Sequence, residues 1–305
     1  MSAKSELLER LRYIDAAVTL PQVIDVGIAV SEHNKVANLL RKGLSIIAFN
    51  ILEDYIKNKS IEALGLLSST TISFANLPNA LQELAIGGAL SSLSFQSRIF
   101  KKENPDYKLI IQEETRKISS TGLTPYELSK FSLLSSGSNV SSGEIKEFLT
   151  AFGIANGWNL LKSISDSIGG GIPDLAQAFN NASQRRHSSA HSAAFDYDYT
   201  WLANLKSEIL SISSSVDIVI SARCRQASRK PLLRLEDHNL NDDLNYRFLE
   251  THGTIFKETK SIGGKSIKNW ASMNDAFIYH SPKISSRKEF LIVLNAGKRI
   301  MDWLI

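Results

Sequence analysis

Apolar residues recur at three- and four-residue steps through the first two thirds of this 305-residue chain. Such spacing is typical of helices that bury one face. The longest stripe begins after Glu32 and continues to Tyr55, and it predicts a helix over residues 32–58 that is the longest in the chain. Shorter stripes predict further helices over residues 7–18, 81–85, 110–118, 144–152, 159–168, 173–185 and 201–223. The first 225 residues therefore favour a helical bundle.

The pattern changes after Gln226, where polar residues become denser and apolar runs become shorter. Two short apolar segments flank Thr251-His252-Gly253, and this arrangement predicts a hairpin. We expect strands at Tyr246–Phe248, Thr254–Phe256 and Phe277–Tyr279 and a helix at Glu289–Trp303. The predicted fold class is mainly α, with a helical domain over residues 1–225 and a small α+β unit over residues 226–305.

The charge balance excludes several classes of protein. Lys and Arg number 35 against 31 Asp and Glu, and hydrophobic residues make up 43% of the chain. These values rule out a disordered tail protein, a collagen and a strongly basic packaging protein. The whole excess of positive charge lies in residues 226–305, which contain 13 Lys and Arg against 9 Asp and Glu. Two interpretations stay open: two units with different surfaces, or a chance distribution over a solvated surface.

Cysteine usage and apolar runs bear on the compartment. Cys224 is the only cysteine, so neither an intrachain disulfide nor a Cys-based zinc site can form, and a reducing compartment fits best. The segment Met1–Arg12 is too charged for a signal peptide. The longest apolar stretch, Leu39–Ile56, contains Arg41, Lys42, Glu53 and Asp54, a charge load that a membrane span would not tolerate. We therefore expect a cytoplasmic protein with no membrane partner.

The densest cluster of reactive groups is the segment Gln184–His191, which has two adjacent arginines and two histidines. The chain has no P-loop, no His-Glu-x-x-His zinc motif and no Gly-x-Ser-x-Gly elbow. An Arg beside a His suits a phosphodiester, because the guanidinium holds phosphate oxygens and the imidazole transfers protons near neutral pH. RNA carries its own nucleophile, the 2′-hydroxyl, so such a pair suffices for RNA cleavage without a metal.

Three residues of this segment resemble the signature of the HEPN superfamily of ribonucleases, an Arg separated by four to six residues from a His. Arg186 is followed by the polar His187 and then, five positions on, by His191. The surroundings are similar to the RiboL-PSP-HEPN branch of that superfamily. The similar segments are Asn38–Gly43, Ile51–Tyr55 and Phe152-Gly153 ahead of Trp158. The resemblance covers roughly residues 30–225 and leaves out the last quarter.

The resemblance implies a metal-independent endoribonuclease without a cofactor, acting as a toxin or as an anti-phage (abortive infection) effector. His191 would be the general acid and base, Arg186 would stabilise the transition state, and His187 would shape the site. It also implies a homodimer, and an antitoxin or regulatory protein partner is consistent with it. Two alternatives stay open. One is a non-catalytic helical module that binds RNA, nucleotide or protein, and the other is a scaffolding helical part with an active C-terminal unit.

The Arg–His spacing alone is not specific. Arg247 and His252 match it as well, although they lie in the predicted hairpin, and Arg185 matches with His191 at the longer spacing. Five-residue spacing places two side chains about 140° apart on a regular helix, so Arg186 and His191 would not meet on one phosphate. Either the helix breaks near Ser188-Ser189, or the site is completed by the motif of a second chain.

Further residues are weaker candidates. Glu53, in the long early helix, either orients Arg186 through a charge-assisted bond or is an ordinary surface acid. Arg185 either contacts substrate phosphate or faces solvent. Tyr197 and Tyr199 could stack an unpaired base, and core packing is the alternative. Lysines of the C-terminal unit could hold RNA or a regulatory partner: Lys257, Lys260, Lys265, Lys268 and Lys288.

Overall fold

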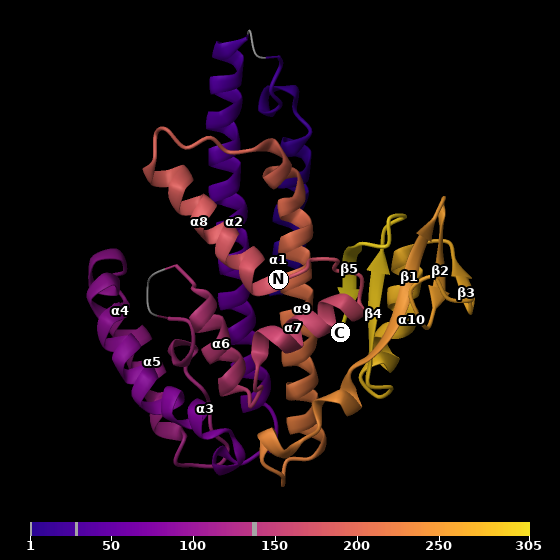
Figure 1. Ribbon diagram of the computed structural model, residues 1–305. Coiled ribbons are helices and arrows are strands. Elements are labelled where there is room, and N and C mark those ends of the chain that lie inside the picture. Colours follow the sequence, from indigo (N-terminus) through magenta and orange to yellow (C-terminus); the bar gives the residue numbers. More distant parts are fainter. Residues whose placement is uncertain (1, 28–29, 136–138) are drawn as a thin grey trace.

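Long helices form the axis of the molecule (Figure 1). The computed structural model describes residues 2–27, 30–135 and 139–305. In chain order the helices of the first part are α1 (Ala3–Val18), α2 (Ser31–Ser68), α3 (Asn79–Glu83), α4 (Ala89–Glu103), α5 (Tyr107–Ser120), α6 (Ser142–Ala151), α7 (Gly157–Ser167), α8 (Leu175–His191) and α9 (Tyr199–Arg229). The predicted helical bundle is confirmed. Part of the predicted loop at 132–143, residues 136–138, lies outside the described residues.

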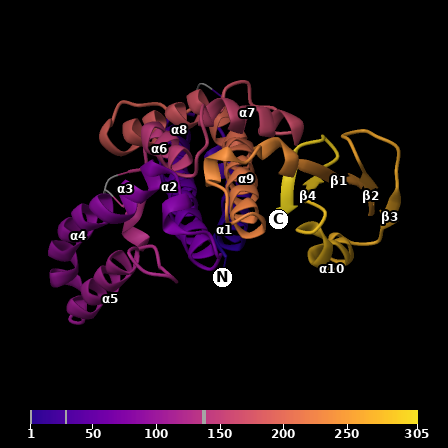
Figure 2. The same ribbon diagram turned by 90° about the horizontal axis from the view of Figure 1, so that it is seen from below.

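The spine of the fold is α2, which lies beside α1, α8 and α9 (Figures 1 and 2). It runs ten residues beyond the predicted end at residue 58. The apolar stripe that predicted this helix ends at Tyr55, but Lys59 beyond it is buried and its Nζ lies 2.5 Å from Oδ1 of Asp217 on α9. A long-range ion pair thus keeps a polar residue inside the helix, which local sequence cannot reveal.

Removing Lys59 tests this buried pair. Loss of one member of a buried ion pair leaves the other charge uncompensated, at a cost of about 3–5 kcal/mol. We expect Lys59→Met to lower the free energy of unfolding by about 3 kcal/mol in urea denaturation, because the buried Asp217 carboxylate loses its cationic partner and keeps only the Ser221 and Trp303 donors. The double variant Lys59→Met/Asp217→Asn should lose less, since an amide is neutral and still accepts from the Trp303 Nε1–H. A double variant less stable than the single one contradicts this account.

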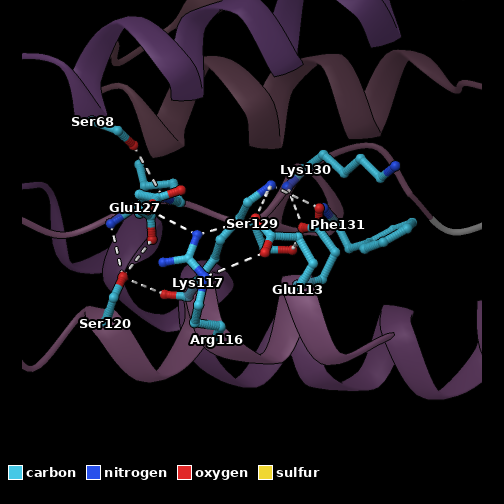
Figure 3. Close-up of polar contacts among 11 residues, drawn as sticks. Ser68, Glu113, Arg116, Lys117, Ser120, Glu127, Ser129, Lys130 and Phe131 are labelled. Carbon is cyan, nitrogen blue, oxygen red and sulfur yellow. Dashed lines mark hydrogen bonds and ion pairs between the residues drawn. The ribbon is translucent and has the colours of Figure 1, made fainter. Parts of the chain in front are cut away.

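A polar network attaches the α4–α5 hairpin to the segment that follows it (Figure 3). Glu114 of α5 is buried, and its carboxylate accepts hydrogen bonds from the Ser129 hydroxyl at 2.7 Å and from Lys117 Nζ at 2.9 Å. The Arg116 guanidinium pairs with Glu113 at 3.0 Å and with Glu127 at 2.9 Å. The network fixes the chain on its way from α5 toward α6.

The last quarter is a five-stranded sheet with one helix. The strands are β1 (Asn245–His252), β2 (Ile255–Thr259), β3 (Lys268–Trp270), β4 (Glu289–Leu294) and β5 (Ile300–Leu304), and α10 spans Met273–Ile284. The strand order is β3-β2-β1-β4-β5, with β1 and β4 parallel and the other pairs antiparallel. The predicted hairpin is confirmed: β1 and β2 are joined through Gly253.

Two predictions for this quarter are wrong. The expected helix at Glu289–Trp303 is the strand pair β4–β5. The segment Phe290–Leu294 is buried on both faces, and a continuous apolar run of that length is compatible with either period. The expected strand at Phe277–Tyr279 lies inside α10, whose buried residues Ala276, His280 and Ile284 recur at four-residue steps.

The sheet and the helices share one hydrophobic core. Phe248, Phe290, Ile292 and Trp303 belong to the same buried cluster as the apolar residues of α2 and α9, whereas the other sheet face packs on α10. The Gly169-Gly170-Gly171 turn after α7 admits the β4–β5 loop. Gly171 has φ +68°, and a Cβ there would lie 1.2 Å from the Arg299 guanidinium. The domain boundary predicted at 225/226 falls near the end of α9, and the division into two domains stays a prediction.

Among the described residues, no helix is both long enough and apolar enough to cross a lipid bilayer.

Candidate active site

The Gln184–His191 segment forms the last turns of α8. The helix begins where the carboxylate of Asp174 accepts a hydrogen bond from the Gln177 N–H at 2.9 Å. Its apolar stripe packs on the axis of the bundle, where Phe179 meets Phe49 of α2 with ring centroids 5.4 Å apart. The polar end of α8 thus projects from a buried base.

The helix does not break at Ser188-Ser189, so the break that sequence reasoning left open is wrong. The Ser189 hydroxyl lies 3.1 Å from the Ser45 hydroxyl of α2. This tertiary contact occupies the group that would otherwise compete for the backbone. Arg186 and His191 therefore lie on different sides of one continuous helix, about 140° apart.

The structure brings the three motif residues together in pairs. The rings of His187 and His191, one turn apart, have centroids separated by 4.6 Å, and both histidines are exposed. Arg186 and His187 line a cavity of about 450 Å³, with Asn139, Ser183, Gln184 and Ser188. The Nε of Arg186 is buried and has no hydrogen-bond partner among the described residues. A guanidinium with a donor to spare at a cavity suits an anionic ligand.

Glu53, on α2, is near enough to Arg186 of α8 for the two charges to interact. It is 6% exposed, and its Oε1 accepts a hydrogen bond from the Val140 N–H at 2.6 Å. Burial raises the pKa of Glu53, and Val140, Lys57 and Arg186 offset only part of that rise. Within the described ranges no ion pair joins Glu53 and Arg186, and the two groups interact through space, where the positive charge of Arg186 lowers the pKa of Glu53.

The chain that follows His191 is held by α2. Asn38 accepts from the Tyr197 N–H at 2.9 Å and donates to the Phe195 carbonyl at 3.2 Å. The Arg41 guanidinium, 2% exposed, donates to the Tyr197 carbonyl at 2.6 Å. Lys42 Nζ donates to the carbonyls of residues 192 and 193, both at 3.1 Å. We call residues 192–198 the strap.

Sequence reasoning noticed Asn38, Arg41 and Lys42 as part of a family-like run but gave them no role. The local signal was only their three- and four-residue spacing, since the same inward face of α2 also buries the polar residues Ser45, Glu53 and Lys59. Polar side chains on a buried helix face need specific partners.

The remaining candidates are placed away from the cavity. Arg185 packs over the Trp201 ring at 5.1 Å, and its Nη1 lies 3.8 Å from the Glu208 carboxylate. Tyr197 is 1% exposed and packs in the core, so as placed it offers no face to a base. Tyr199, half-buried at the start of α9, donates its hydroxyl to the Val18 carbonyl at 3.3 Å.

The second Arg–His match, Arg247 and His252, does not form a comparable site, because the guanidinium is engaged by carboxylates. Arg247 of β1 pairs with Glu258 at 2.7 Å and with Glu289 at 2.8 Å, and His252 is exposed at the strand end. No group of three His, Cys, Asp or Glu side chains with the geometry of a metal site occurs within residues 2–27, 30–135 and 139–305.

Residues 5–222 of the chain match the RiboL-PSP-HEPN family. The chain belongs to this family. No curated protein and no solved structure matches it. Membership in the RiboL-PSP-HEPN family indicates a nuclease or RNA-related function. The match includes α8 and the strap and ends seven residues before the end of α9, so the sheet lies outside it.

Glu53→Gln tests the burial of this carboxylate. Because burial raises the pKa of Glu53, ionising this carboxyl costs more free energy in the folded than in the unfolded protein, so it lowers stability at neutral pH. The amide keeps an oxygen that can accept from Val140 and carries no charge. We expect Glu53→Gln to have a higher Tm than wild type at pH 7, with the difference vanishing as the pH falls toward 4.5, where Glu53 is protonated as well. The exposed Glu83→Gln is the control. A lower Tm at pH 7 refutes the expectation.

Proposed function

We propose that this protein is a metal-independent endoribonuclease whose site is formed by Arg186, His187 and His191. The observation that carries the proposal is the exposed His187–His191 pair at the end of α8 beside a cavity lined by Arg186, within a RiboL-PSP-HEPN domain. The family resemblance extends the proposal to a cytoplasmic toxin or anti-phage effector that an antitoxin or another regulatory protein holds in check.

The chemistry follows from these side chains. His191 removes the proton of a ribose 2′-hydroxyl, and the oxygen attacks the adjacent phosphorus. Arg186 neutralises the charge that develops on the phosphate oxygens. The bond from phosphorus to the 5′-oxygen breaks, and an imidazolium returns a proton to that oxygen. The products are a 2′,3′-cyclic phosphate and a 5′-hydroxyl, and His187 shapes the site beside His191.

A single chain leaves this site incomplete. Arg186 and His191 point about 140° apart, and the helix between them is continuous. We propose that a second copy of the chain completes the site, so that Arg186 of one subunit acts with His191 of the partner subunit. We propose that the second copy covers an exposed apolar surface of α2, on the side of the helix away from the strap. This surface consists of the exposed residues Val36, Leu39, Leu40 and Ile47, with Leu39 68% exposed.

His191→Ala tests the proposed chemistry. Loss of a general acid or base lowers rates by about 10²–10⁴-fold, and loss of a charge-stabilising group has a similar effect. We expect His191→Ala and Arg186→Ala to cleave total cellular RNA in EDTA at least about 10²-fold more slowly than wild type, with an unchanged circular dichroism spectrum. Mapping of the ends should show cyclic phosphates for wild type. His252→Ala, in the second Arg–His match, is the control.

Equal cleavage by wild type and His191→Ala would instead favour the C-terminal unit as the active part. Tight RNA binding without cleavage by any variant favours a non-catalytic RNA-binding module.

Leu39→Asp tests the second copy. A charge in an apolar interface is costly, so this variant should sediment as a monomer where wild type is a dimer. Its RNA cleavage should fall by about 10²-fold, because the site is no longer completed. Leu232→Asp is the matched control, since Leu232 is 90% exposed and lies far from α8 in the chain. Full cleavage by a proven monomer contradicts the composite site.

A further inference from the structure

Lys42 is a buried cation whose partners are carbonyls. It is 8% exposed on α2, and its ammonium donates to the Ser192 and Ala193 carbonyls, both at 3.1 Å. The ammonium also lies 5.9 Å from the centre of the Phe195 ring. In the described part of the chain no carboxylate pairs with Lys42. Its charge is therefore directed at the backbone that follows α8.

That backbone is the end of the helix that carries His191. The last carbonyls of an α-helix have no partner within the helix, and the C-terminal end carries partial negative charge. Many helices end with a glycine in the left-handed region, which closes these carbonyls locally. Here the capping residue is Ser192 with φ −116° and ψ 111°, so the chain leaves α8 in an extended conformation. The Ser192 and Ala193 carbonyls accept hydrogen bonds from Lys42, and the Ser192 carbonyl also accepts from the Phe195 N–H at 3.3 Å.

The strap is held at its far end too. Asn38, one turn of α2 before Lys42, and the adjacent Arg41 bind the backbone of residues 195 and 197. The Ser45 hydroxyl contacts Ser189, so the last turn of α8 has a second contact with α2. These contacts define where α8 ends, and His191 is its last residue.

Arg186 does not depend on this end. It lies more than one turn earlier, beside the segment that Glu53 holds through Val140. Fraying of the last turn of α8 would move His191 and leave Arg186 in place.

We propose that Lys42 is a positioning residue that caps α8 from outside and sets the position of His191 relative to Arg186. The proposal rests on the proposed nuclease function for its kinetic consequence, but the cap itself is independent of it. Because Lys42 acts on the proton-transferring group and not on the group that binds phosphate, its loss should lower kcat with little change in KM.

The experiment compares wild type, Lys42→Met, Lys42→Arg and the matched control Lys35→Met, an exposed lysine of the same helix. Small misplacements of a reacting group cost about 10²-fold in rate. We expect Lys42→Met to lower kcat by about 10–100-fold with KM within about twofold of wild type. Lys42→Arg should recover most of the rate, because a guanidinium can also donate to both carbonyls. Lys35→Met should behave as wild type.

Amide hydrogen exchange tests the capping role of Lys42 independently of the proposed nuclease activity. Lys42→Met should speed exchange at residues 188–195 and leave residues 175–183 unchanged, whether or not any RNA is cut. If wild type cleaves no RNA but Lys42→Met shows this exchange pattern, the nuclease proposal is refuted and the capping role of Lys42 stands. Unchanged exchange at residues 188–195, or an unchanged kcat in an active enzyme, overturns the role of Lys42. If Lys42→Met does not fold, Lys42→Gln keeps an uncharged NH₂ donor and is judged by the same two measurements.

Discussion

Charged side chains buried along α2 are the constraint on which the rest of the structure depends. Arg41, Lys42, Glu53 and Lys59 face inward on this 38-residue helix, and each is nearly excluded from water. A buried charge is costly unless it is paired or hydrogen-bonded. Together these four charges fix three distant segments: Arg41 and Lys42 hold the strap, Glu53 holds the chain before α6, and Lys59 pairs with Asp217 on α9.

The same interactions join the sheet to the helices. The Asp217 carboxylate accepts from the Trp303 Nε1–H at 2.7 Å, so the ion pair of the two axial helices extends to β5. Lys4 of α1 pairs with Asp302 at 2.6 Å on the neighbouring position. The sheet lies outside the family match, and Asp217, which pairs with Lys59 of α2, also binds Trp303 of the sheet. The same residue thus joins α2, α9 and the sheet.

Local periodicity was sufficient where burial follows a single period. The stripes predicted most of the helices and the hairpin because a one-sided apolar pattern has only one compatible element. No stripe predicted α4, and part of the longest stripe, Val36, Leu39, Leu40 and Ile47, is exposed on α2. Local periodicity failed where burial did not follow the local pattern: the polar segment at 57–60 is inside α2, and the run at 290–294 is buried on both faces. At the site, the reactive residues stood out by chemistry and resemblance. The residues that hold them in place could not be predicted, because Lys42 and Ser192 are 150 positions apart in the chain.

The two faces of α2 connect the proposals on the site. The turns that carry Arg41, Lys42 and Ser45 on the inner face carry Leu39, Leu40 and Ile47 on the outer face. A second copy packed on the outer face would immobilise those turns, and the inner face would then hold the strap and the end of α8 more rigidly. In that arrangement, completion of the site by the partner and fixation of His191 are coupled through one helix segment. A chain without a partner would lack the second motif, and its own strap and α8 end would be held less rigidly.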